Sequence, residues 1–342
     1  MFLVKSEAPT RIDLAGGTLD LWPLAYQIEK KATVNVAIDL FARCEVSLSN
    51  QENFVFYSAD LNKTISLSYA ALRKDRELAL ISRLVHELWR PNLPALKISS
   101  RSGSPAGAGL GGSSAMAVAI AAALWRVRQI FEDLPELEEK QLVRLVQNAE
   151  SEIIHAPTGT QDYWGAVRGG VNLMSYPYAG EEIQTHPCEI LGPIKDQMLF
   201  CYTGISRASA DNNWQVFKAV FEAQKKTLSL LEQIGSAAWE CREAVLRSDF
   251  QGILKASAQD WNLRTQLWKD IETEETRRIS DLAKENGAFQ TRLGGAGGGG
   301  VMLIFVDAEK KANLALKLKE AGFNILDANI THRKLHITCD KA

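Results

Sequence analysis

Cysteine is sparse and scattered in this sequence of 342 residues, and neither sign of charge is in clear excess. The five cysteines lack the close spacing of a zinc site or a disulfide framework. They are Cys44, Cys188, Cys201, Cys241 and Cys339. A net charge of -2 leaves no basic surplus to neutralise a nucleic-acid backbone. We therefore expect buried thiols, a reducing cytoplasm and no nucleic-acid partner.

Long hydrophobic runs are also missing. The N-terminal segment MFLVKSEAPTR lacks the apolar region of a signal peptide. The longest apolar run, Ala115–Trp125, is too short to cross a bilayer before Arg126 interrupts it. We expect no membrane partner, and instead a protein that acts on a small molecule as a monomer or a homodimer.

The order of strand-like and helix-like segments predicts an α+β fold. Residues 1–100 read mainly as strands, most of the second half as helices, and the end as a strand, helix and strand. The predicted helices of the second half are Ala208–Gly235, Ala237–Leu246, Gly252–Glu272, Glu275–Glu285 and Ala308–Ala321. A boundary within Pro177–Pro193 divides the chain into an N-terminal domain, 1–185, and a C-terminal domain, 186–342.

A glycine-rich segment, SGSPAGAGLGGSSAMAVAIAAALW (102–125), stands between a predicted strand, LKISS, and an alanine-rich helix. Glycine permits positive φ and close approach of a ligand, and a helix N-terminus offers free N–H groups. Together these features predict an anion site over Pro105–Gly112, with Ser113 and Ser114 positioned to cap the helix. The alternative is an ordinary tight turn from strand to helix.

The type of phosphate ligand follows from what surrounds this loop. Its glycines fit G-x-G-x-x-G, but Glu132 follows an unbroken helix and not the second strand of a dinucleotide fold, which disfavours a nicotinamide enzyme. Ser113 stands where a P-loop has lysine. A bound triphosphate therefore needs a metal ion, for which the hydroxyls of Ser113 and Ser114 are plausible contacts.

Four segments in order make the pattern specific: Ala8–Asp20, Pro105–Ala115, Gly159–Asp162 and Gly287–Gly300. This set resembles the GHMP kinases, the family of galactokinase, homoserine kinase, mevalonate kinase and phosphomevalonate kinase. The first segment is most similar to the branch of heptose-phosphate kinases and fucokinases. The resemblance implies an N-terminal domain like domain 2 of ribosomal protein S5, a ferredoxin-like C-terminal domain, and ATP in the cleft between them.

The resemblance also implies binding roles for ATP and magnesium. The residues expected to wrap the triphosphate are Pro105, Gly107, Gly109, Leu110, Gly111, Gly112, Ser113 and Ser114. A second glycine loop over 294–300, with Gly295, Gly297 and Gly298, is expected to line the active site. The expected contacts of Mg²⁺ are Ser113 or Ser114 and Glu152, although Glu150 lies two residues away and is an alternative.

The catalytic and acceptor residues are implied in the same way. Asp162 matches the carboxylate that acts as base or orients the attacking hydroxyl, and Arg11 matches a basic residue beside it. A carboxylate suits this step because the hydroxyl loses its proton as it attacks, and a guanidinium suits it because phosphoryl oxygens gain charge. The residues expected on the acceptor side are Gly17, Thr18, Asp20, Gln161 and Arg207.

We therefore predict an ATP- and Mg²⁺-dependent kinase that phosphorylates a hydroxyl of a sugar or sugar phosphate. The alternatives are a mevalonate-type kinase and a non-catalytic nucleotide-binding relative. Three departures from the pattern of the family, Leu21, Tyr163 and Arg292, remove no proposed catalytic group but leave the acceptor open.

Overall fold

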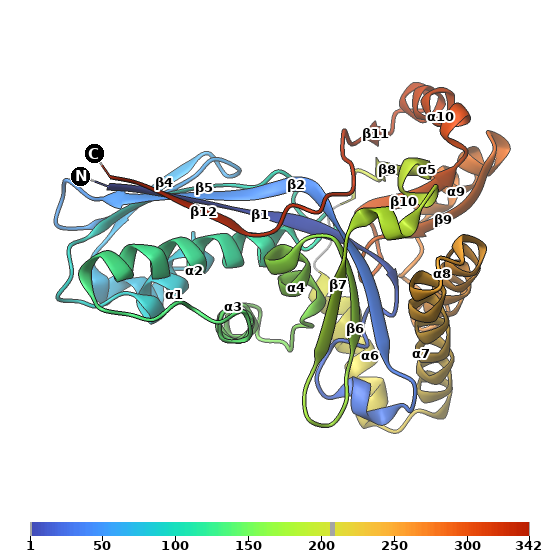
Figure 1. The fold of residues 1–342 in the computed structure, drawn as a ribbon, viewed down its shortest axis with the longest axis horizontal. Coiled ribbons are helices and arrows are strands. Elements are labelled where there is room, and N and C mark those ends of the chain that lie inside the picture. Colours follow the sequence, from blue (N-terminus) through green and yellow to red (C-terminus); the bar gives the residue numbers. More distant parts are fainter. Residues whose placement is uncertain (1, 206–208, 342) are drawn as a thin grey trace.

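The computed structural model describes residues 2–205 and 209–341, and in these residues the strands form two sheets (Figure 1). The large sheet contains β1 (Phe2–Ala15), β2 (Ala32–Leu48), β3 (Phe54–Ser58), β4 (Lys63–Leu67), β5 (Leu96–Arg101), β6 (Val171–Ser175), β7 (Glu182–His186) and β12 (His336–Lys341). Its order is β12-β1-β2-β5-β3-β4, and β6 pairs with both β2 and β7. The small sheet contains β8 (Met198–Tyr202), β9 (Ala288–Leu293), β10 (Val301–Val306) and β11 (Asn324–Ile325).

The helices pack in three groups around these sheets (Figure 1). The first group lies on one face of the large sheet and contains α1 (Ala79–Leu88), α2 (Gly112–Phe131), α3 (Glu139–Ile154) and α4 (Gln161–Arg168). The second contains α6 (Ser209–Phe221), α7 (Lys225–Leu246) and α8 (Phe250–Arg264), of which α7 and α8 pack together. The third flanks the small sheet and contains α5 (Ile194–Gln197), α9 (Glu274–Glu285) and α10 (Ala308–Glu320).

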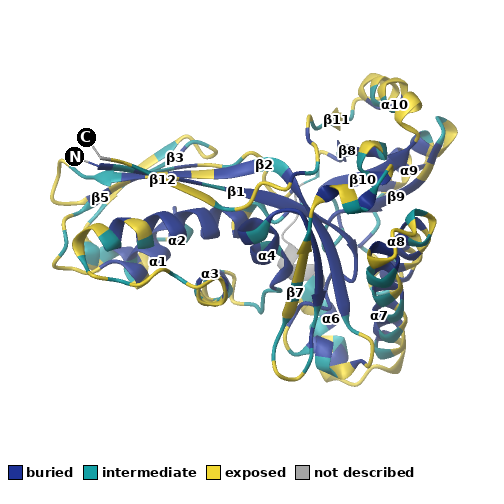
Figure 2. Cartoon of the chain, in the orientation of Figure 1, coloured by how far each residue is buried: buried dark blue, intermediate teal, exposed yellow. Residues whose placement is uncertain are grey.

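Helix α2 forms the centre of the larger core (Figure 2). Its alanines are buried and allow close packing against β1, β2 and the neighbouring helices. By length and composition α2 is apolar enough to cross a membrane, but 72% of its apolar window is buried inside the protein. We therefore describe it as a core helix. Its N-terminus, at Gly112, opens onto the loop that the sequence singles out.

The small sheet has the order β11-β8-β10-β9, with all neighbours antiparallel. In chain order this is fourth, first, third and second strand, with helices between the first and second strands and between the third and fourth. This is the ferredoxin-like arrangement, and the α+β fold expected from the sequence is confirmed. The last strand, β12, pairs with β1, so the chain end returns to the large sheet. The domain boundary at 185/186 stays a prediction.

The predicted helix Ala208–Gly235 is wrong in its extent. Ala223 adopts a φ of 52°, which a right-handed helix excludes, and it separates α6 from α7. Helix α7 instead continues through Gly235 to Leu246. The glycine is required there because a Cβ at this position would lie 2.0 Å from the carbonyl oxygen of Lys30. Tertiary packing explains this glycine, whereas local propensity reads it as a helix end.

Candidate active site

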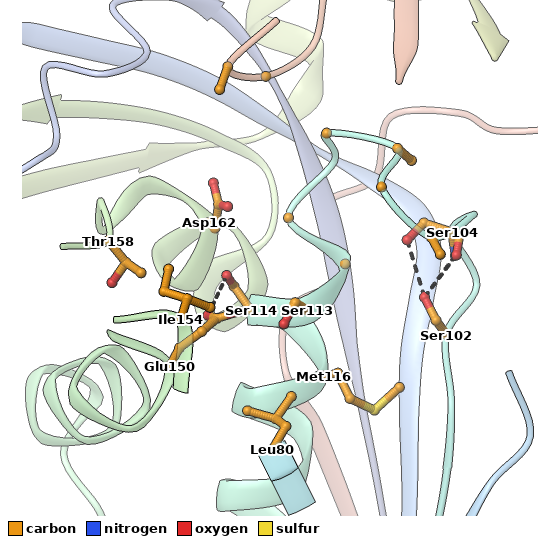
Figure 3. Close-up of a pocket in the computed structure, with 18 of the residues that line it drawn as sticks. Leu80, Ser102, Ser104, Ser113, Ser114, Met116, Glu150, Ile154, Thr158 and Asp162 are labelled. Atoms are coloured by element: carbon orange, nitrogen blue, oxygen red, sulfur yellow. Dashed lines mark hydrogen bonds between the residues drawn. The ribbon is translucent and has the colours of Figure 1, made fainter. Parts of the chain in front are cut away.

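The glycine-serine segment lies at a cavity of about 620 Å³ (Figure 3). The cavity is also lined by residues from the first motif on β1 and its following turn, from α1, α3 and α4, and from the second glycine loop. The four motifs of the sequence therefore all contribute residues to one cavity. They are Ala8–Asp20, Pro105–Ala115, Gly159–Asp162 and Gly287–Gly300. Among the polar residues expected from the sequence, Arg11, Asp20 and Asp162 line this cavity together with the two serines of the first loop.

Left-handed glycines shape the first loop. Gly107, Gly109 and Gly111 have φ values of 65°, 71° and 69°, a region that other residues rarely adopt. The N-cap residue of α2 is Gly111, so the prediction that Ser113 and Ser114 cap this helix is wrong, because both lie inside its first turn. The loop leads directly into the helix N-terminus and its free amides. Of the residues predicted to contact ATP, Leu110 differs from the rest. Its side chain is buried in the core and its carbonyl accepts the amide of Arg11 at 3.0 Å, so it anchors the loop.

The second glycine loop packs directly on the first. A Cβ at Gly295 would lie 2.6 Å from the carbonyl oxygen of Gly109, so the contact requires glycine. Gly295 lines the cavity, but Gly297 and Gly298 are not among its lining residues. A Cβ at Gly297 would meet the side chain of Ile271 at 2.6 Å, and the amide of Gly298 donates to the Ile271 carbonyl at 2.8 Å. These two glycines therefore stabilise the loop through contacts with Ile271, on the side that does not line the cavity.

Arg11 joins both glycine loops to Asp162. Its Nε donates to Asp162 Oδ1 at 2.6 Å, and its Nη2 also contacts this oxygen. Its Nη1 donates to the carbonyls of Gly109 at 2.9 Å and Gly294 at 2.8 Å. Burial lowers the pKa of Arg11, but the charges of Asp162 and Asp13 outweigh this, so the net shift of the pKa is upward. The guanidinium therefore stays charged and holds the carboxylate of Asp162 in place.

Asp162 stands in the first turn of α4 and lines the cavity. A Cβ at Gly111 would lie 3.1 Å from the Asp162 side chain, and the φ of 69° at this position also favours glycine, so α2 begins close to the carboxylate. Gly165, one turn later on α4, similarly makes room for Arg11. The carboxylate and the helix N-terminus therefore border the same end of the cavity (Figure 3).

Glu150 and Glu152 of α3 differ in burial and in the residues they contact. Glu150 is only 7% exposed and lines the cavity, where its Oε2 accepts the hydroxyls of Ser114 and Tyr163, each at 2.8 Å (Figure 3). Burial raises the pKa of Glu150, although hydrogen bonds from hydroxyl groups partly oppose this. The side chain of Glu152 is 45% exposed and pairs with Arg83 on α1.

Glu152 is not among the residues that line the cavity, whereas Glu150 is. The geometry therefore favours Glu150 over the predicted Glu152 as the carboxylate that contacts Mg²⁺. Residues two apart on a helix lie on nearly opposite sides, which is why only one of the pair can face α2. The alternative, Glu150, has the position that a metal-binding carboxylate needs. Tyr163, noted in the sequence only as a departure, supports Glu150 through its hydroxyl.

Asp20 also lines the cavity and is nearly fully buried. Its Oδ2 accepts the amide of Gln161 at 3.0 Å, and a Cβ at Gly159 would lie 1.9 Å from this oxygen. Burial, and then the charge of Asp162, raise the pKa of Asp20 to about 6. A buried carboxylate beside a cavity is suited to accept hydrogen bonds from hydroxyl groups, because each of its oxygens accepts more than one.

The other residues expected on the acceptor side have different places. Thr18 lines the cavity, and its hydroxyl donates to Asn213 Oδ1 at 3.4 Å. Gly17 is not a lining residue, because it packs against Arg264. Arg207 lies outside the described residues.

Sequence reasoning missed one cation of this cavity, Arg264 at the end of α8. Nothing near it in sequence marks it as functional. Its place depends on contacts with β1 and with the second glycine loop, more than thirty residues away in the chain.

Comparisons with known proteins agree with this geometry. The family model described as the GHMP kinases N terminal domain matches residues 77–170, and the GHMP kinases C terminal model matches residues 241–324. Together these matches cover just over half of the chain. Two curated proteins and one crystal structure, whose descriptions each name a kinase of a sugar or a sugar phosphate, show how far the similarity extends.

The chain is 29% identical to D-glycero-alpha-D-manno-heptose 7-phosphate kinase of Campylobacter jejuni, over 94% of this chain and 95% of that protein. It is 24% identical to L-fucokinase/L-fucose-1-P guanylyltransferase of Bacteroides fragilis, over 88% of this chain and 34% of that protein. The crystal structure of a D-glycero-D-manno-heptose 1-phosphate kinase from Bacteroides thetaiotaomicron superposes with a TM-score of 0.77. It is 23% identical and covers 98% of each chain, which shows a shared fold.

Proposed function

Because this chain belongs to the GHMP kinase family, we propose that it transfers the γ-phosphoryl group of ATP to a hydroxyl group of a sugar phosphate. The observation that carries the proposal is the position of Asp162. Its carboxylate, paired with Arg11, borders the same end of the cavity as the glycine loop and the N-terminus of α2. This position supports a role for Asp162 as proton acceptor beside a loop suited to bind phosphate.

In the proposed reaction the acceptor hydroxyl attacks the γ-phosphorus, and its proton passes to the carboxylate of Asp162. A new O–P bond forms, the bond between the γ-phosphorus and the bridging oxygen breaks, and ADP leaves with the electron pair. The amides of the glycine loop and of α2 bind the phosphates, since main-chain N–H groups complement negative charge. Arg11 orients the carboxylate of Asp162, because its guanidinium is itself fixed by two carbonyls.

The cavity also fits Mg²⁺ as a partner of the nucleotide. The Ser114 hydroxyl and the Glu150 carboxylate supply the hard oxygen ligands that this ion prefers. Among the residues that the structure describes, no cluster of three or more histidine, cysteine, aspartate or glutamate side chains is able to hold a metal. Mg²⁺ commonly takes one or two carboxylates and completes its shell with phosphate oxygens and water. When bound, the ion neutralises charge on the phosphates.

The acceptor is proposed from two supports. Heptose-phosphate kinases are among the relatives that align over nearly the whole chain, and Asp20 offers a buried carboxylate for sugar hydroxyls. We also propose a cytoplasmic location, which agrees with five free cysteines, four of them buried.

The test measures ADP release with ATP, Mg²⁺ and a panel of heptose phosphates, hexoses and mevalonate. We expect Asp162→Asn to lower kcat by about 100-fold or more, with the KM for ATP within about threefold of the parent, because only proton transfer is lost. Asp281→Asn, the same change on the exposed face of α9, serves as the control. An unchanged rate in Asp162→Asn contradicts the assigned role, and tight ATP binding without turnover on any acceptor supports a non-catalytic relative.

A further inference from the structure

A cluster of four charged side chains is buried beside the cavity. Asp13 on β1 accepts from Arg264 Nη1 and from Arg292 Nη2, each at 3.0 Å. Arg292 Nη2 also donates to Asp260 on α8 at 3.0 Å. All four side chains are at most 3% exposed. The cluster joins β1 of the large sheet to β9 of the small sheet and to α8.

Stability alone is a weak explanation for such a cluster. Burying ions costs several kcal/mol each, and well-packed apolar residues of similar volume often replace a buried ion pair without loss of stability. The position of the cluster is more informative. Arg264 lines the cavity, and its Nη2 donates to the carbonyl of Gly295 at 3.0 Å. One member of the cluster therefore holds the second glycine loop directly.

Two arginines share the task of holding this loop. Arg11 donates to the carbonyl of Gly294, and Arg264 donates to the next carbonyl, that of Gly295. Arg11 and Asp13, the counter-ion of Arg264, are two residues apart and therefore lie on the same face of β1. Since Gly295 packs on Gly109, a shift of this carbonyl is transmitted to the first loop.

Gly17, in the first motif, packs against the guanidinium of Arg264. A Cβ at Gly17 would lie 2.2 Å from Arg264 Nη1 and 2.8 Å from an oxygen of Asp13. The guanidinium occupies the place of a side chain at this position, which accounts for the glycine. The amide of the preceding Gly16 donates to Asp260 at 2.8 Å, so both glycines of the pair contact charged residues of α8.

We propose that Arg264 is a positioning residue for the phosphate end of the cavity. With Asp13 as its counter-ion, it fixes the second glycine loop against the first, and Gly17 leaves the space in which its guanidinium sits. This inference rests on the proposed function, because it treats the two loops as the site of the ATP phosphates. It assigns to Arg264 no contact with the reacting atoms.

The experiment measures the binding of ATP with Mg²⁺ and of adenosine by titration calorimetry, with thermal unfolding as the fold control. We expect Arg264→Met to weaken ATP binding by at least about tenfold, as for the loss of a charged hydrogen bond, and adenosine binding by less than about twofold. Arg264→Lys keeps the charge but not the planar fork that reaches both partners, so an intermediate loss is expected. Arg242→Met removes a guanidinium that contacts Glu243 on α7 and should leave both affinities unchanged.

Gly17→Ala disturbs the same guanidinium without changing any charge, because the added Cβ would lie 2.2 Å from Arg264 Nη1. We expect it to reproduce the loss of ATP affinity, and the double variant with Arg264→Met to be no worse than Arg264→Met alone, because both remove one interaction. Additive losses, equal losses for ATP and adenosine, or full ATP affinity in folded Arg264→Lys and Gly17→Ala would each overturn the inference. A parent that binds adenosine but not ATP refutes the proposed function itself.

Discussion

The buried carboxyl group of Asp20, proposed to bind the acceptor, should make the free energy of unfolding depend on pH. Burial, with the charge of Asp162 as a second cause, raises the pKa of Asp20 from 3.8 to about 6. The folded protein therefore binds this proton more tightly than the unfolded chain does. In the window between these two pKa values the free energy of unfolding falls as the pH rises, and the full cost of the buried charge is present above about pH 6.

The size of the effect follows from the shift. About two pKa units correspond to a cost of about 3 kcal/mol at pH 8, of which about half remains at pH 5. Asp20→Asn keeps an oxygen that accepts the amide of Gln161 but removes the charge. We therefore expect the variant to exceed the parent in free energy of unfolding by up to about 3 kcal/mol at pH 8 and by about half as much at pH 5. It should also raise the KM for the acceptor.

Urea unfolding of the ligand-free protein at pH 5 and pH 8, followed by tryptophan fluorescence, measures both differences. Asp281→Asn makes the same chemical change at an exposed position of α9 and controls for general effects of charge. A gain for Asp20→Asn that is equal at the two pH values, or a parent that is the more stable protein at pH 8, would refute the reasoning. Either result would mean that the ionised carboxylate is not penalised by burial.

Two further variants test the metal contact and the contact between the loops. Glu150→Gln should lower kcat by about 100-fold, because the metal loses its carboxylate ligand, whereas Glu152→Gln should stay within about twofold, because it loses only a half-exposed ion pair. A large loss in Glu152→Gln and none in Glu150→Gln would reverse the assignment. Gly295→Ala forces a Cβ to within 2.6 Å of the Gly109 carbonyl, and overpacking of about 1–3 kcal/mol should weaken ATP binding by about tenfold or more in titration calorimetry. Unchanged ATP affinity would show that the two loops need not touch.

The loops and the core helix illustrate how much of this protein is readable from local sequence. Glycine at 107, 109 and 111 predicted a backbone with positive φ before a helix, and the structure has that backbone. Helices α9 and α10 lie within one residue of their predicted bounds, since caps and apolar periodicity act over a single turn or two. The break at Ala223 was not predicted. The continuation through Gly235 was not predicted either, because it depends on the contact with Lys30, which is distant in sequence.

The sequence by itself determined the family, the α+β fold and four of the segments that line the cavity, because these depend on residue types at short spacing. Only the tertiary structure decided that Glu150 faces Ser114 while Glu152 faces Arg83, and that Gly297 supports its loop from behind. It alone brought Arg264 to Asp13 across 251 residues of chain. Spacing along a strand or helix says which side chains share a face, but the partner of that face depends on how the whole chain packs.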